Sequence, residues 1–138
     1  MLTIITGELM IEILVEFEKS SGLLNVLFSN STKKSFELRR LYEPHDVVIE
    51  SQEGLRAEYY LSFPCGADVE TFTLKSQEKF ECTVNLATDF VYPQSGKYRA
   101  WIDYDSSKET AKYAKADFYK TRLISNVVEF PIDLPAEA

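Results

Sequence analysis

The sequence predicts an all-β fold, an immunoglobulin-like antiparallel β-sandwich of about seven to nine strands. Short runs of alternating apolar and polar residues recur about every eight to twelve residues, with turn signals between them, as in sandwiches and barrels. The chain also holds nine Phe and eight Tyr, and aromatic residues favour strands. Its 138 residues suit one domain, which we expect to span 1–134, with 135–138 as a frayed tail.

The first half of the chain predicts a hairpin followed by three further strands. Between Leu9 and Phe17 every second residue is apolar, which indicates a half-buried strand. Turn residues at 19–22 separate it from an extended apolar run at 23–29, so we expect these two strands to pair. Further strands are expected at 36–42, 47–49 and 55–63, separated by turns at 43–46 and 51–54.

The second half predicts four more strands and one segment that departs from their rhythm. The strands are expected at 69–74, 80–86, 97–104 and 123–132, and the departing segment at 105–122. Within it, Ser106-Ser107-Lys108-Glu109 has the spacing of a helix capping box, and Ala111, Ala114 and Phe118 follow at helical intervals. A short helix and an extended hairpin both fit this segment. It is basic, whereas the chain as a whole has a net charge of −7.

Three motifs in the second half suggest a family. They are the turn from Leu74 to Glu78, the strand entry Gly96-Lys97-Tyr98, and the final strand Leu123-Ile124-Ser125-Asn126-Val127-Val128. In this order they resemble the immunoglobulin-like domain that accompanies deuterolysin-type and related bacterial metalloproteases, over about the last 65 residues. In this family the turn usually contains Pro-Gly, whereas this chain has Lys75-Ser76-Gln77 there. No His-Glu-x-x-His is present, so the family's zinc chemistry does not carry over.

Three of the matched residues have structural roles that follow from their chemistry. Gly96 permits a positive φ at the turn into its strand. Tyr98 is expected to pack inward while its hydroxyl ties down a neighbouring loop, as tyrosine corners do. The amide of Asn126 is expected to satisfy a backbone group near the start of a strand.

Charge and composition argue against several ligands and locations. Affinity for nucleic acid rests on clustered Lys and Arg, which a chain of net charge −7 does not favour. The glycines are isolated, so no phosphate-binding loop and no cofactor are expected. Acidic residues from Glu8 to Glu18 interrupt the first apolar run, so it predicts neither a signal peptide nor a membrane span. Cytoplasmic location is the expectation.

Catalytic and metal-binding groups are sparse. His45 is the sole histidine, and a triad with Asp46 and Ser51 would need oxyanion donors of which the sequence gives no sign, so we expect no enzyme. Asp103 and Asp105 alternate on one strand, where a weak calcium site is the alternative to a solvated face. Because no Asp-x-Asp-x-Asp-Gly loop strengthens that alternative, no metal is expected.

The two cysteines, Cys65 and Cys82, are too few for a disulfide scaffold. They form no Cys-x-x-Cys pair, which removes support for zinc or thioredoxin-like chemistry. Reduced, part-buried thiols are the leading interpretation, and a single bridge between the two is the alternative in an oxidising compartment.

What remains is recognition of another protein, because the segment at 105–122 joins basic and aromatic residues on an acidic body. We expect a non-enzymatic binding domain, with an inhibitor or immunity-type partner of a secreted hydrolase as its specific form. The candidate partner-binding residues are Tyr104, Lys112, Tyr113, Lys115, Phe118 and Tyr119.

Two other functions stay open. A carbohydrate-binding module would stack Trp101, Tyr98 and exposed tyrosines on sugar rings; it requires Trp101 to lie exposed in a coplanar platform. A homo-oligomer would form if the edge of the final strand paired with a neighbouring copy, since unpaired strand edges template association.

Overall fold

The computed structural model describes residues 10–60, 71–107 and 117–135, and it confirms the all-β sandwich. The helix among these residues, α1 (Glu43–Asp46), is a single turn. The strands are β1 (Ile11–Glu18), β2 (Leu23–Asn30), β3 (Phe36–Arg39), β4 (Val47–Ser51), β5 (Glu58–Tyr59), β6 (Thr71–Leu74), β7 (Lys79–Asn85), β8 (Phe90–Val91), β9 (Gly96–Asp105), β10 (Asp117–Phe118), β11 (Arg122–Ile124) and β12 (Val128–Ile132).

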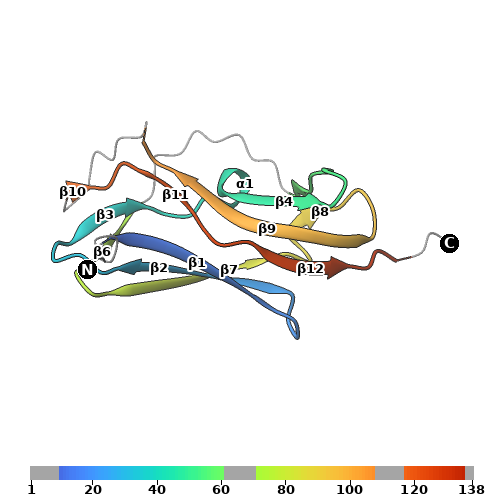
Figure 1. The fold of residues 1–138 in the computed structure, drawn as a ribbon, viewed down its shortest axis with the longest axis horizontal. Helices are drawn as coiled ribbons and strands as arrows, with labels where there is room; N and C mark the ends of the chain where they lie inside the picture. Colours follow the sequence, from blue (N-terminus) through green and yellow to red (C-terminus); the bar gives the residue numbers. More distant parts are fainter. Residues whose placement is uncertain (1–9, 61–70, 108–116, 136–138) are drawn as a thin grey trace, which may run out of the picture.

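Two antiparallel sheets form the sandwich (Figure 1). One has the strand order β1-β2-β7, and in the other β9 lies between β4 on one side and β11 with β12 on the other. Immunoglobulin-like sandwiches place the first, second and fifth strands on one sheet and the third, sixth and seventh on the other. The strands β1, β2 and β7, facing β4, β9 and β12, have this arrangement. Two smaller sheets complete the fold, one joining β10, β3 and β6 and one joining β5 and β8.

The central strands of the two sheets, β2 and β9, supply the middle of the core. Every second residue points inward from each, because side chains alternate along a strand. The rings of Phe28 and Tyr104 meet edge to face across the sandwich, with centroids 5.6 Å apart. The fully buried side chains of these two strands are Leu24, Val26, Phe28, Tyr98, Ala100, Ile102 and Tyr104.

The predicted first hairpin is confirmed. The inward residues of β1, Ile11, Ile13 and Val15, are buried, and β1 pairs with β2 over its whole length. Gly22 closes the turn with a φ of +74° and donates its N–H to the carbonyl of Glu18 at 2.9 Å. Residues other than glycine rarely adopt that φ, which explains the glycine here.

The predicted tyrosine corner is also confirmed. Tyr98 is fully buried, and its hydroxyl donates to the carbonyl of Gln94 at 2.7 Å. Gly96 begins β9 with a φ of +145°. The glycine and the hydroxyl together fix the path of the loop that enters β9.

The predicted strand at 123–132 is corrected to two strands separated by a bulge. Ile124 lies opposite Asp103 and Val128 opposite Ala100, so three residues at 125–127 face two on β9. Ser125 causes the break: its N–H donates to the carbonyl of Ile102 at 2.9 Å, and its hydroxyl accepts the N–H of Ile102 at 2.8 Å. A bulge of this kind re-aims the side chains beside it.

Asn126, in the bulge, joins the two sheets. Its side-chain oxygen accepts the N–H of Val15 at 2.8 Å, and its amide nitrogen donates to the carbonyl of the same residue at 2.9 Å. The side chain therefore replaces a neighbouring strand at the outer edge of β1, which confirms the predicted backbone-satisfying role of Asn126.

Other strand predictions need changes at their ends. The third strand ends at Arg39 and not at residue 42, because the chain leaves β3 to form α1, whose first turn holds Pro44. Of the strand expected at 55–63, only Glu58–Tyr59 is a strand in the described residues. The two-residue strand β8 (Phe90–Val91) was too short for its pattern to reveal. Residues 61–63, 69–70 and 136–138 lie outside the described part of the chain.

We expect Asn126→Ala to lower the free energy of unfolding by about 1 to 2 kcal/mol, because it leaves both backbone groups of Val15 without a protein partner. Urea denaturation measures the change. Asn25→Ala, on the outward face of β2, is the control and should leave stability nearly unchanged. Equal stability of the Asn126 variant and the wild type would contradict the role of this side chain as a link between the sheets.

Candidate functional site

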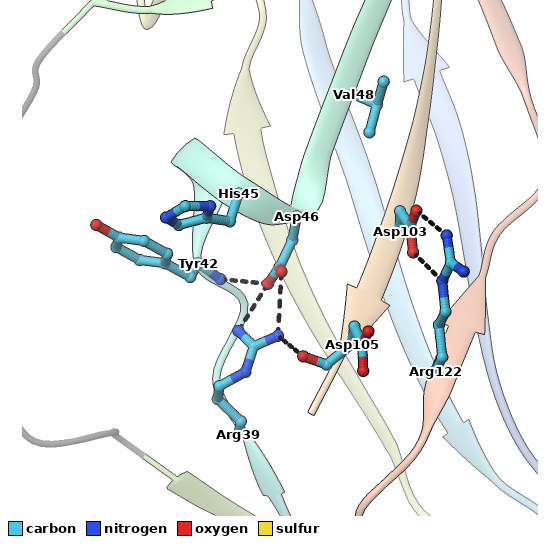
Figure 2. A pocket seen from close by; sticks show the side chains of 8 residues that line it. All are labelled: Arg39, Tyr42, His45, Asp46, Val48, Asp103, Asp105 and Arg122. Atoms are coloured by element: carbon cyan, nitrogen blue, oxygen red, sulfur yellow. Dashed lines mark hydrogen bonds and ion pairs between the residues drawn. The ribbon is translucent and has the colours of Figure 1, made fainter. Parts of the chain in front are cut away.

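A groove of about 450 Å³ opens at the base of the segment 105–122 (Figure 2). β3, α1, β4, β9 and β11 surround it. Its lining residues are Arg39, Tyr42, His45, Asp46, Val48, Asp103, Asp105 and Arg122. Charged groups of both signs and two aromatic rings thus face one hollow beside the segment that the sequence had marked for recognition.

The floor of the groove is a buried ion pair between Arg39 and Asp46, whose side chains are 7% and 4% exposed. Two hydrogen bonds join the guanidinium to the carboxylate, at 2.8 and 3.0 Å. The Asp46 carboxylate also accepts the N–H of Tyr42 at 2.7 Å. A buried carboxylate is destabilising unless hydrogen-bond donors compensate its charge, and the three donors around Asp46 do so.

Local sequence explains why Asp46 reaches this position. Pro44 lies in the first turn of α1, where its missing N–H costs nothing. The N–H groups of His45 and Asp46 both donate to the carbonyl of Tyr42, at 3.1 and 2.8 Å, so the chain makes one tight turn. That turn points the Asp46 side chain back toward β3 and Arg39, as Figure 2 shows.

Tyr104 packs against the Arg39 side of the ion pair. The guanidinium carbon of Arg39 lies 4.6 Å from the centroid of the Tyr104 ring, and the hydroxyl donates to the Arg39 carbonyl at 2.9 Å. Burial raises the pKa of Tyr104 to about 12. Tyr104 is fully buried, so it offers no surface to a partner and is removed from the candidate binding residues.

The rim of the groove carries a second ion pair, between Asp103 and Arg122. Two hydrogen bonds, at 2.9 and 2.7 Å, join the guanidinium to the carboxylate, and they hold the pKa of Asp103 below its ordinary value of 3.8. The neighbouring Asp105 carboxylate accepts the N–H and hydroxyl of Ser107, at 3.0 and 2.6 Å. Within the described residues, no three His, Cys, Asp or Glu side chains gather as metal ligands.

The three groups considered for a catalytic triad point in different directions. His45 is exposed and stacks on Tyr42, with ring centroids 5.1 Å apart. Asp46 turns toward Arg39, and the buried Ser51 hydroxyl accepts the N–H of Leu55 at 3.0 Å within its own turn. His45, Asp46 and Ser51 therefore do not form the hydrogen-bonded relay that nucleophilic catalysis needs.

An apolar strip continues from the groove across the outer face of the β4-β9-β11 sheet. Val48 lies opposite Trp101, and both are half-buried. Ile124, just before the bulge, and Val127, its last residue, are 59% and 53% exposed. The sequence predicted one strand at 123–132, and neither Ile124 nor Val127 was among the predicted binding residues. Ile124 could have been found by its alternation with the inward Leu123, whereas Val127 owes its position to the bulge.

Two candidate residues of the insert are described, and both lie beside β3. The Tyr119 ring packs on Phe36 with centroids 5.0 Å apart, and its N–H donates to the Glu37 carbonyl at 2.8 Å. Phe118 is half-buried and pairs with Glu37 in the parallel ladder between β10 and β3. The three other candidates, Lys112, Tyr113 and Lys115, lie outside the described residues, as do all residues from 108 to 116 in the segment for which helix and hairpin were alternatives.

The base of that segment is paired as in a hairpin. β11 runs antiparallel to β9, with Arg122 opposite Asp105. Ser106, at the end of β9, donates its N–H to the Thr121 carbonyl at 2.8 Å and its hydroxyl to the Tyr119 carbonyl at 2.9 Å. These bonds hold the two ends of the insert together at the edge of the groove.

The surroundings of Trp101 bear on the carbohydrate-binding alternative, which requires a coplanar aromatic platform. Along the sheet, the outward neighbours of Trp101 are Val48, Arg99 and Asp103, none of which is aromatic.

The state of Cys82 bears on the disulfide alternative. Cys82 is a half-buried free thiol, and burial raises its pKa to about 11. Its predicted alternative partner, Cys65, lies outside the described residues.

Comparisons with known proteins add no relative: no family model matches the chain, and no curated protein matches it. In the part of the chain that the structure describes, no helix has the length and apolar composition of a membrane span.

We expect Asp46→Ala to lower the free energy of unfolding by about 3 to 5 kcal/mol, because it leaves the buried Arg39 guanidinium without its carboxylate. The double variant Arg39→Met, Asp46→Leu should cost less, since it removes both charges. Arg56→Ala, which breaks an exposed pair with Glu50, is the control and should cost no more than about 1 kcal/mol. Denaturant unfolding measures the free energy of unfolding of the three variants. A decrease for Asp46→Ala no larger than that for Arg56→Ala would refute the stabilising role of the pair between Arg39 and Asp46.

The Asp103 carboxyl should titrate below its ordinary value of 3.8, because the Arg122 guanidinium stabilises the charged form. This pair contributes stability above the pKa of the unfolded state, and the contribution is lost as the pH falls through the lower folded-state pKa. Carbon NMR of the side-chain carboxyl measures the shift. In Arg122→Gln the pKa of Asp103 should rise; an unchanged titration would show that Arg122 does not cause the shift.

Proposed function

We propose that this chain is a non-enzymatic protein-binding domain whose binding surface is the outer face of the β4-β9-β11 sheet together with the adjoining groove. The observation that carries the proposal is the exposure of Ile124 and Val127 beside the half-buried Trp101. In the part of the chain that the structure describes, two of these three apolar side chains are more than half exposed. They are suited to burial against a second molecule.

The surroundings of this strip support the proposal. Protein interfaces commonly have an apolar centre and a polar rim, with Trp, Tyr and Arg over-represented where binding energy is concentrated. On one side of Trp101 lie Asp103 and Arg122, and on the other Glu50 bonds to Arg99 at 3.0 Å and to Arg56 at 2.9 Å. The expected partner therefore presents an apolar centre and a rim with charges of both signs.

The buried floor of the groove adds rigidity to the surface. Arg39 and Asp46 hold α1 against β3, and this places Tyr42 and His45 at one end of the strip. A rigid surface loses little conformational entropy on binding, which favours affinity. The specific form of the function, an inhibitor or immunity-type partner of a secreted hydrolase, remains part of the proposal, and the two end residues of the 105–122 segment, Asp105 and Arg122, line the same groove.

The test begins with affinity capture of a partner from the native source, followed by calorimetry of the purified pair. Ile124→Asp should weaken binding at least tenfold, because it places an unpaired charge in the centre of the interface. Leu14→Asp is the matched control: Leu14 is 47% exposed on the outer face of the other sheet. Equal affinities for Ile124→Asp and the wild type would overturn the proposed surface.

A further inference from the structure

The edges of the two main sheets differ in how they are closed. Asn126 occupies the outer edge of β1 by bonding both backbone groups of Val15. β12 contains Pro131, which has no N–H to offer to an added strand. Natural sheets use such devices to prevent edge-to-edge association.

β7 is an edge strand that has neither protection in the part of the chain that the structure describes; the edge of β4, by contrast, is partly covered, because the Ala57 N–H donates to the Ile49 carbonyl and the Ser51 N–H to the Leu55 carbonyl. β7 is the last strand in the order β1-β2-β7, and it has seven residues without proline. Just before β7, the Asn30 N–H donates to the Glu78 carbonyl, and this bond is in line with the ladder between β2 and β7. Because antiparallel ladders alternate, Phe80, Cys82 and Val84 bond to β2, whereas the backbone groups of Lys79, Glu81 and Thr83 point away from it.

The side chains along β7 also suit an added strand. Phe80 and Cys82 point toward the core but are only half-buried, in contrast to the fully buried Val84. The Phe80 ring stacks on Phe72 with centroids 4.4 Å apart, and the guanidinium carbon of Arg40 lies 5.8 Å from the Phe80 centroid, so the inner side of this edge is aromatic, partly covered by Arg40 and still partly open to solvent. On the outer side Lys79 and Glu81 are exposed, and the salt bridges found among the described residues include neither.

We propose that β7 pairs antiparallel with β7 of a second copy of this chain, with the two-fold axis at Phe80. In this register Lys79 of each copy lies opposite Glu81 of the other, and opposite charges on facing positions stabilise an antiparallel pair. Lys79 and Glu81 are also residues whose backbone groups point outward, so they can exchange hydrogen bonds across the new pair.

Other registers lack this complementarity. An axis at Glu81 places two like charges directly opposite, which destabilises the pair. An axis at Cys82 places Glu81 opposite Thr83 and leaves Lys79 opposite Asn85, so that no ion pair forms. Charge therefore favours the axis at Phe80, in which Lys79, Phe80 and Glu81 are the β7 residues that lie within the strand of both copies. This contact uses the opposite sheet from Trp101 and is independent of the proposed partner surface.

Sedimentation velocity of the full chain over a range of concentrations tests the proposal. The wild type should dimerise, and Lys79→Glu or Glu81→Lys should each weaken dimerisation at least tenfold, since each places like charges on facing positions. The double variant Lys79→Glu, Glu81→Lys should restore it, because the exchange recreates both pairs. Glu16→Lys, on the outward face of β1, is the control for a general charge effect and should dimerise like the wild type.

Thermal unfolding followed by circular dichroism shows whether each variant is folded; the three substituted positions, Glu16, Lys79 and Glu81, are all exposed. A wild type that stays monomeric at every concentration overturns the proposal. So do single variants that dimerise like the wild type, or a folded double variant that stays monomeric. A disulfide between the Cys82 residues of the two copies, formed in a Cys65→Ser background, would also overturn it, because that bond requires the axis at Cys82.

Discussion

The buried ion pair between Arg39 and Asp46 is the interaction on which the geometry of the candidate site depends. It joins β3 to α1, and the Arg39 guanidinium also lies on the Tyr104 ring of β9, although β3 and β9 share no backbone ladder. Since a buried charge that loses its partner destabilises a fold by several kcal/mol, the single turn α1 cannot leave β3 at low cost. The positions of Tyr42 and His45 and the start of β4 follow from this constraint.

The bulge at 125–127 is a second constraint, and it has two consequences on opposite sides of the chain. Toward β1, it frees Asn126 to bond Val15 and so closes one sheet edge. Toward solvent, it leaves Ile124 and Val127 exposed beside Trp101. One extra residue in the last strand thus provides both a link between the sheets and the apolar part of the proposed binding surface.

Alternation and turn chemistry were enough to predict the sandwich, the first hairpin, the tyrosine corner at Tyr98 and the role of Asn126. They could not predict the bulge, since Ser125 breaks the strand through bonds to Ile102, a residue far away in sequence. For the candidate site, the sequence predicted the adjoining segment 105–122 but not the residues of the groove and the apolar strip. Aromatic residues are common both in cores and at interfaces, and this is why Tyr104 was chosen although it is buried. Ile124 was missed although its alternation with the inward Leu123 indicates an outward position.

The two proposed contacts would reinforce each other. The partner surface lies on the β4-β9-β11 sheet, and the proposed dimer forms at the edge of the β1-β2-β7 sheet, so neither contact occupies the other. A two-fold dimer through β7 would carry two copies of the Trp101 strip. Two linked sites bind a partner that presents two epitopes, or lies at high density on a surface, more tightly than either site alone, without any new contact. A domain whose single interface is modest in area would gain most from such pairing, because its second binding step becomes intramolecular.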